Sequence, residues 1–210
     1  MVTMLKPITP GILSVLVKGG DIHLLADLAP ELEAQLAPAG IDTLLRKAHF
    51  LAQAAYESGY FSRLDENLNY SAAHIVELYG KTHPDVARRA NVLAHDPKAF
   101  GSAIYANRFG NGNEASGDGY RFRGRGILMT TFRDNYRAQG VEDDPDSVAT
   151  PAGAVKTAIA YWNSRKCNEA ADADNCPRVT FLINGGSNGL SDRSILKARA
   201  MELLADGQST

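Results

Sequence analysis

Residues 48–69 read A-H-F-L-A-Q-A-A-Y-E-S-G-Y-F-S-R-L-D-E-N-L-N, and the rest of the chain is interpreted around them. Apolar residues recur at spacings of three and four over residues 44–55, which predicts a helix with one apolar face. Glu57 lies in the last turn of this helix, Gly59 ends it, and Glu66 follows nine residues after Glu57. The segment therefore places two carboxylates at the end of a core helix and shortly beyond it.

The composition is that of one ordinary globular domain. The chain has 210 residues, of which 44% are hydrophobic and 22% charged. A formal net charge of −2 argues against bulk nucleic-acid binding, and no apolar run approaches the ~18 residues of a membrane span. Residues 11–17 are the best candidate for a signal peptide, but Thr9-Pro10 before them and Lys18 with two glycines after them favour a capped helix. We therefore expect the chain to be made and folded in a cytoplasm.

Helix signals recur along the whole chain, so a mainly helical protein is expected. Helix starts are predicted at Thr9, Asp21, Pro30, Asp42, Ser71, Pro84, Asp96, Thr131, Thr150, Pro177 and Ser191. In the last of these helices, the side chains expected to face inward are Ile195, Leu196, Ala198 and Leu203. Residues 107–126 are glycine-rich with little apolar periodicity, and such a long loop is usually functional or disordered. The only plausible strands are residues 120–123 and 68–70.

Glu57 has an unusual place for an acidic residue. The last turn of a helix is the negative end of its macrodipole, where cations are normally favoured. This position, with aromatic residues around it, favours the protonated carboxyl that a general acid of a glycosidase needs. The alternative is an exposed glutamate tolerated at small cost.

Glu66 is the candidate partner carboxylate. A separation of nine residues permits the ~6.5–9.5 Å between the carboxyls of an inverting glycosidase, but it does not require it. The alternative is a loop glutamate that accepts hydrogen bonds from nearby amides. Asp65, Glu114 and Asp118 are rival carboxylates.

Six arginines gather within thirty residues of a slightly acidic chain. Paired hydrogen bonds with carboxylates, or contact with an acidic polymer such as a cell-wall glycan, explain them better than nucleic-acid stacking does. They are Arg108, Arg121, Arg123, Arg125, Arg133 and Arg137.

The cysteines and histidines give no metal-binding pattern. Cys167 and Cys176 are nine residues apart with no histidine between them, which leaves either two reduced thiols or a disulfide formed after export. The five histidines show no ligand spacing, and His49, two turns before Glu57, is expected to be a satisfied core or surface residue.

Several motifs taken together resemble glycoside hydrolase family 19, which comprises plant-type chitinases and related phage and bacterial peptidoglycan hydrolases. The resemblance covers Phe50 to about Arg193 and leaves residues 1–40 unmatched. Its motifs are F-L-A-Q-A-A-Y-E-S-G-Y-F (50–61), E-N-L-N-Y-S-A (66–72), I-Y-A-N-R-F-G-N-G (104–112), S-G-D-G-Y-R-F-R-G-R-G (116–126), F-R-D-N-Y (132–136) and I-N-G-G (183–186). Among subtypes, the chain looks most like an endolysin of a phage that infects Gram-negative bacteria.

The resemblance implies a lysozyme-like α+β fold that is mainly α: one helical, two-lobed catalytic domain over residues 1–210, with a central cleft, a small β element and no wall-binding module. It implies an inverting mechanism without metal or organic cofactor. Glu57 matches the general acid, Glu66 the general base, and Thr131 the hydroxyl that holds the attacking water. The residues implied for substrate binding or its support are Asn135, Tyr136, Asn184 and Arg193, with Arg193 matching an arginine that supports the catalytic network.

Three positions depart from the family pattern. Tyr56 stands where a histidine commonly precedes the acid, Met129 where a glutamine binds substrate, and Asp134 where plant chitinases have a tyrosine. Because these changes affect sugar contacts and not the two glutamates, they weaken the case for plain chitin.

The expected activity is therefore cleavage of β-1,4 bonds in peptidoglycan, with a chitinase as the alternative. A catalytically dead glycan-binding protein and an amide-cleaving wall enzyme are less favoured. An endolysin of this kind accumulates as a monomer in the host cytoplasm and reaches periplasmic peptidoglycan after a holin opens the membrane, without contacting the holin, nucleic acid or membrane itself.

Overall fold

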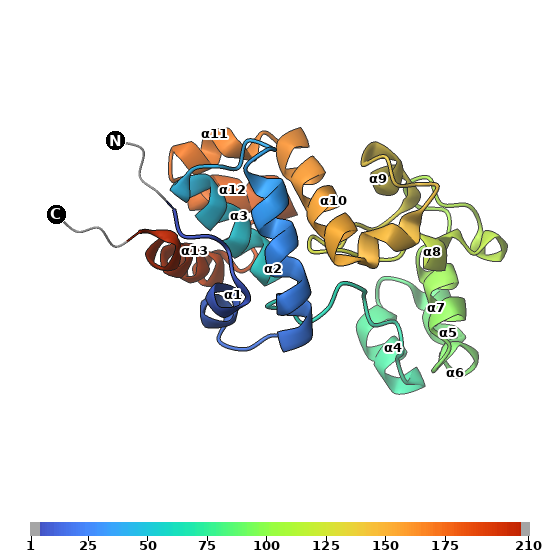
Figure 1. Ribbon diagram of the computed structural model, residues 1–210. Coiled ribbons are helices and arrows are strands. Elements are labelled where there is room, and N and C mark those ends of the chain that lie inside the picture. The colour runs from blue at the N-terminus through green and yellow to red at the C-terminus, as the bar shows by residue number, and fades with distance from the viewer. Residues whose placement is uncertain (1–4, 207–210) are drawn as a thin grey trace. The chain divides into compact units, whose positions relative to one another are not determined.

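The computed structural model describes residues 5–206, and its regular structure is helical (Figure 1). The helices are α1 (Pro10–Val17), α2 (Ile22–Leu36), α3 (Leu44–Glu57), α4 (Ala72–Tyr79), α5 (Pro84–Arg88), α6 (Ala90–Leu93), α7 (Pro97–Ile104), α8 (Asp118–Arg121), α9 (Arg133–Ala138), α10 (Pro151–Ser164), α11 (Cys167–Asp172), α12 (Cys176–Asn184) and α13 (Leu190–Leu204). Two short 3₁₀ helices, η1 (Glu114–Ser116) and η2 (Pro145–Ala149), complete the regular elements. The mainly helical class predicted from the sequence is confirmed.

The chain forms two compact units. Unit 1 comprises the chain up to Leu64, the short segment Gly126–Leu128 and the chain from Val148 onward. Unit 2 comprises Asp65–Arg125 and Met129–Ser147. Each unit has its own hydrophobic core.

Helix α3 is the centre of unit 1. Every residue from Lys47 to Ala55 is buried, with α13 packed along the helix and α11 and α12 also in contact with it (Figure 1). The predicted apolar positions Ala48, Leu51, Ala52 and Ala55 lie in the core, and the other positions of this stretch are buried as well because neighbouring helices surround α3 on several sides. Among the buried aromatic residues beside it, Trp162 meets Phe50 edge to face with ring centroids 5.4 Å apart.

The core of unit 2 is small and aromatic. Phe100 of α7 is fully buried, and the rings of Tyr70 and Tyr79 meet it edge to face at 5.5 Å and 5.4 Å. Ile75 of α4 and Leu93 of α6 lie in the same cluster. This core holds α7 in place, and the glycine-rich segment follows directly after that helix.

Most of the predicted helix starts are confirmed. The side chains of Thr9, Ser71, Asp96 and Thr150 accept hydrogen bonds from first-turn amides of their helices. Helix α12 ends at Gly185 with a positive φ of 75°, as the N-G-G turn predicted.

Two of the predicted starts before Glu57 were wrong. Pro30 does not begin a helix but lies inside α2, on its exposed side, and the buried positions Leu28 and Leu32 continue across it. Burial of that face stabilises a continuous helix despite the hydrogen bond that proline cannot donate. Helix α3 is capped by Thr43, whose hydroxyl accepts from the Arg46 amide, and not by Asp42.

The inward face of α13 was also predicted wrongly in part. The helix follows Gly189 instead of a Ser191 cap, and it buries Arg193, Leu196, Ala200 and Leu204. Ile195 is 53% exposed and Ala198 is exposed as well. The buried face includes Arg193, which was not among the side chains expected to face inward.

The small β element is reduced to isolated bridges. Residues 118–121 form α8, and residues 68–70 have no regular structure, so both predicted strands were wrong. Within residues 5–206 the β pairing consists of the bridges Leu5–Ala205, Asp65–Arg125 and Arg125–Thr130.

Two further observations bear on earlier expectations. Cys167 and Cys176 are both buried free thiols, so the disulfide alternative was wrong. Among the described helices, none combines the length and the apolar character that crossing a bilayer requires.

Candidate active site

Glu57 is the last residue of α3 and is held by a buried arginine. The Nη2 of Arg193 donates to Glu57 Oε1, and its Nη1 donates to Gln53 Oε1, one turn earlier on α3. The Nε of Arg193 donates to the Asn188 carbonyl at 3.1 Å. We call Gln53, Tyr56, Glu57 and Arg193 the Glu57 cluster.

Arg193 is only 1% exposed, and Nε, Nη1 and Nη2 of its guanidinium each donate one hydrogen bond to these partners. A group buried to this degree offers no open face to a sugar, so its contacts fit the supporting role that the resemblance implies and not a direct sugar contact. Its geometry is that of a positioning residue, which fixes one oxygen of Glu57 from α13.

Tyr56 completes the Glu57 cluster. The Arg193 Cζ lies 4.3 Å from the centre of the Tyr56 ring, which is a cation–π contact. The tyrosine that stands where the family commonly has a histidine thus packs on the arginine that binds Glu57. Gly189 faces the same ring, with a φ of 68°, and a Cβ there would overlap the Tyr56 side chain. Glycine at 189 is thus required both by its backbone conformation and by the ring beside it.

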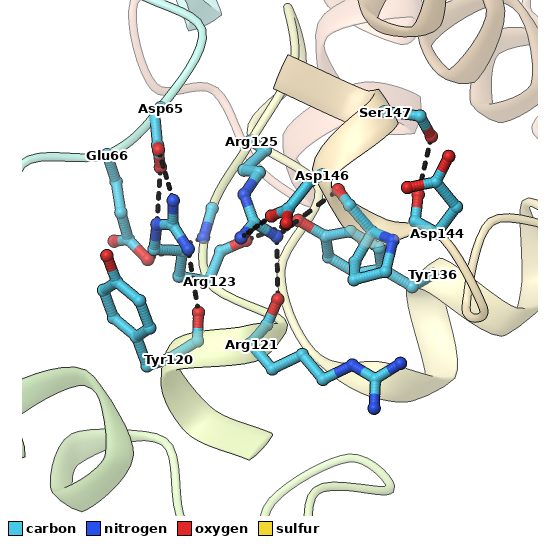
Figure 2. A network of polar contacts seen from close by, with 12 residues as sticks. Asp65, Glu66, Tyr120, Arg121, Arg123, Arg125, Tyr136, Asp144, Asp146 and Ser147 are labelled. Carbon is cyan, nitrogen blue, oxygen red and sulfur yellow. Dashed lines mark hydrogen bonds and ion pairs between the residues drawn. The ribbon is translucent and has the colours of Figure 1, made fainter. Parts of the chain in front are cut away.

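Glu66, which follows Asp65 in Figure 2, is held by two neutral donors. The Gly124 amide donates to Oε1 at 2.6 Å, and the Tyr105 hydroxyl donates to Oε2 at 2.8 Å. Burial and the neighbouring Glu66 carboxylate raise the pKa of Tyr105, so this hydroxyl keeps its proton and remains a donor. Among the described residues, Glu66 has no cationic partner within ion-pair distance.

The rival carboxylates are all bound to arginines. Asp65 accepts from Nε and Nη2 of Arg123 at 2.8 Å and 2.5 Å. Glu114 is paired with Arg89, and Asp118 with Arg133 at 2.8 Å. Of the four carboxylates considered around this loop, Glu66 alone is left without such a partner.

Thr131 lies beside Glu66 because both contact Gly124. A Cβ on Gly124 would be 3.2 Å from Thr131 Oγ1 and 3.3 Å from Glu66 Cδ. The predicted helix cap at Thr131 was wrong: its hydroxyl donates to the Met129 carbonyl at 2.9 Å, and α9 begins after Phe132. We call Glu66, Tyr105, Gly124 and Thr131 the Glu66 cluster.

Asn135 supports the Glu66 cluster. It lies in the first turns of α9, and its Nδ2 donates to the Thr131 carbonyl at 2.7 Å while the residue remains exposed. The side chain thus fixes the backbone at Thr131, and its amide oxygen accepts no hydrogen bond from the described part of the chain.

Tyr136 is not available to a substrate. It is fully buried, donates to the Arg123 carbonyl at 2.6 Å and accepts from Nη1 of Arg125 at 3.2 Å. Burial raises the pKa of Tyr136 to about 12. The prediction of a sugar contact was wrong, because this tyrosine anchors α9 under the 123–125 segment.

Asn184 shapes a turn in unit 1. Its Nδ2 donates to the Asn188 carbonyl at 3.0 Å, and its Oδ1 accepts from the Gly186 amide at 2.8 Å. The same Asn188 carbonyl accepts from Arg193, so the N-G-G turn is joined to the Glu57 cluster.

The arginine segment mainly pairs with carboxylates, as predicted. Arg123, Arg125, Arg133 and Arg137 each contact at least one aspartate or glutamate. Arg108 and Arg121 instead stack on phenylalanine rings. No group of three or more His, Cys, Asp or Glu side chains in the described part of the chain is arranged to hold a metal ion.

Gln53, Tyr105 and Gly189 were missed by sequence reasoning. Gln53 lies four residues before Glu57 on one helix, a spacing that could have indicated a shared face. Tyr105 and Gly189 gave no local signal, because their partners are 39 residues away and on another helix.

The chain is similar to proteins of one family. It is 40% identical over 176 residues to a glycosyl hydrolase family 19 domain-containing protein of Haemophilus influenzae, a match that covers 81% of this chain and 86% of that protein. No family model matches the chain.

Solved structures share the fold at low sequence identity. Chitinase C from Streptomyces griseus superimposes with a TM-score of 0.60 at 18% identity, over 93% of this chain and 76% of that one. A bacterial family 19 chitinase gives a TM-score of 0.57 at 17% identity, over 94% of this chain and 95% of its own. The fold agrees with the Haemophilus match, whose identity and coverage show that the chain belongs to glycosyl hydrolase family 19 and is a glycoside hydrolase.

Proposed function

We propose that the protein is an endolysin, which cleaves β-1,4 glycosidic bonds of peptidoglycan by an inverting mechanism. Glu66 acts as the general base and Glu57 as the general acid. The observation that carries this proposal is the environment of Glu66, whose carboxylate is held by two neutral donors beside the Thr131 hydroxyl. A carboxyl group with no cationic partner among the described residues is suited to accept a proton from a water that a neighbouring hydroxyl orients.

The Glu57 cluster supports the role of acid through its asymmetry. Arg193 donates to Oε1 of Glu57, while Oε2 accepts no hydrogen bond from residues 5–206. The arginine therefore fixes the direction of the carboxyl and leaves one oxygen to carry the proton for the leaving group. The glutamate side chain is 24% exposed, which leaves it accessible to a substrate.

The substituted glycan of peptidoglycan is preferred to chitin because of position 134. Asp134 occupies the place of a sugar-binding tyrosine in plant chitinases, and it is exposed and paired with Arg137 at 3.0 Å. Chitin remains the second candidate, because the two solved structures of similar fold are chitinases.

The endolysin role rests on motif resemblance to the phage and bacterial branch in residues 66–72 and 104–126. In this proposal the enzyme acts as a monomer on periplasmic peptidoglycan, after a holin has opened the inner membrane. Lysis of permeabilised Gram-negative cells, with intact cells as the comparison, tests this part independently of bond specificity.

The test of the chemistry uses purified peptidoglycan and chitin oligomers in parallel. Mass spectrometry identifies the new reducing ends, and NMR of the first product gives its anomeric form, which should be inverted. Glu57→Gln and Glu66→Gln should each abolish cleavage, whereas Glu77→Gln, an exposed glutamate on α4, should not. Near-normal activity of Glu57→Gln would remove it from the acid role, and cleavage of chitin oligomers alone would make the chitinase the better description.

A further inference from the structure

A polar cavity in unit 2 adjoins the segment that binds Glu66, and nothing in the proposed reaction uses it. We infer that this cavity binds the zwitterionic peptide that substitutes the glycan, so that the enzyme prefers peptide-bearing strands. The inference rests on the proposed peptidoglycan hydrolysis and extends it from the sugar chain to its substituent.

The cavity has a volume of about 540 Å³ and lies between α7, α8 and the chain leading into η2. That volume is within the ~300–1,000 Å³ range of sites for small organic ligands. Arg123 and Arg125 line it, and Gly124 between them donates to Glu66. The segment 123–125 therefore belongs both to the Glu66 cluster and to the cavity wall.

Part of the charge in the cavity is already neutralised. Arg125 pairs with Asp146 at 2.7 Å, and Arg123 pairs with Asp65, as the dashed lines in Figure 2 show. These pairs build the wall and leave little capacity for a ligand.

The remaining charges have no ion-pair partner among the described residues. They are two cations, Lys98 and Arg121, and two anions, Asp143 and Asp144, all of them exposed. In Figure 2 the Arg121 guanidinium extends away from the network, and no dashed line reaches it. Its stacking on Phe122 at 5.2 Å fixes its stem without using its hydrogen-bond donors.

A second observation points to a missing polar partner. Arg125 is 2% exposed, and its Nε is buried without a hydrogen-bond partner in the described part of the chain. A buried unsatisfied donor is costly, so the cavity wall at Arg125 lacks one acceptor among the described residues.

The chemistry of this lining selects a ligand that carries both signs of charge. Lys98 and Arg121 favour carboxylates, and Asp143 and Asp144 favour an ammonium group. A short peptide with free carboxylates and a diamino acid has both, whereas a glycan strand stripped of its peptides keeps only the lactyl carboxylate of its muramic acid and has no ammonium group.

The experiment compares two substrates that share the same glycan strand. One carries its peptides, and the other has lost them to an amidase that cuts the amide linking peptide to sugar. For the wild type, kcat/KM should be higher on the peptide-bearing strand. In the double variant Lys98→Gln/Arg121→Gln this preference should fall roughly three- to tenfold, as expected for two exposed charge contacts.

Two controls make the result specific. Arg88→Gln removes another exposed arginine of unit 2, on α5 and outside the cavity, and it should keep the wild-type preference. Acetylation of the free amine of the peptide should lower the preference of the wild type but should have little further effect on Asp143→Asn/Asp144→Asn.

The outcomes separate this inference from the proposed function. Equal cleavage of both strands by the wild type, or an equal loss on both strands in the Lys98/Arg121 variant, would overturn the peptide site and leave peptidoglycan hydrolysis intact. Failure of the wild type to cleave either strand would refute the proposed function itself.

Discussion

Replacing Tyr105 with phenylalanine tests how Glu66 is positioned. The change removes one hydroxyl, which donates to Glu66 Oε2 at 2.8 Å, and leaves the Gly124 amide as the only donor to that carboxylate among residues 5–206. Hydrogen bonds to charged groups contribute about 1.5–3 kcal/mol. If this amount is lost from the transition state, kcat falls about ten- to a hundredfold, because each 1.36 kcal/mol is a factor of about ten. KM should change little, because the Tyr105 hydroxyl donates its hydrogen bond to Glu66 and not to a sugar.

The assay is initial-rate formation of reducing ends from solubilised glycan strands, with thermal unfolding measured on the same samples. Tyr161→Phe is the matched control: its hydroxyl donates to the Ile183 carbonyl at 3.2 Å in unit 1, and it should lose a hydrogen bond without losing activity. A kcat for Tyr105→Phe within twofold of wild type would refute the positioning role. An unchanged kcat with a raised KM would mean instead that Tyr105 contacts the substrate.

Two further substitutions test other parts of the structure. Gly124→Ala should lower kcat by about tenfold or more, because the added methyl would lie 3.2 Å from Thr131 Oγ1 and 3.3 Å from Glu66 Cδ. Gly11→Ala is the control, since its added methyl would lie 3.8 Å from the nearest atom. A fully active Gly124→Ala enzyme would contradict this packing. Burial lowers the pKa of His49, so the unfolded chain binds more protons than the folded one below about pH 6.5, and the unfolding free energy should fall as the pH is lowered from 7.5 to 5.5. Urea unfolding at both pH values should show a smaller drop for His49→Gln, and an identical drop would exclude His49 as its source.

Helix starts were predictable because the atoms that make them are neighbours in the chain. Ser71 and the amide of His74 are three residues apart, and the same holds for Thr150 and Gly153. The failures were non-local. Pro30 is tolerated inside α2 because one side of that helix is buried against other elements.

The alternating aromatic and basic residues 120–123 illustrate the same limit. They were predicted as a strand, yet the Arg123 guanidinium stacks over the Tyr120 ring at 4.3 Å while binding Asp65. That ion pair joins residues 58 positions apart and overrides the local pattern.

The roles of the two glutamates were predicted from the family resemblance, but most of the side chains that hold them in place were not. Arg193 was expected to support the catalytic network, but its burial and its bond to Gln53, 140 residues away, were not predictable from any local pattern. Thr131 and Glu66 can lie close together because Gly124 between them has no side chain. Considering the polar residues of the sequence alone does not predict this proximity.

The bond between Arg193 and Glu57 spans 136 residues, so the ribosome makes the counter-charge long after the carboxylate. A nascent chain, or one clipped by a protease before α13, contains both glutamates yet lacks the cation that orients the first of them. Competence for hydrolysis is in this way tied to completion of α13, and fragments that end before it should be inert even where their remaining helices form.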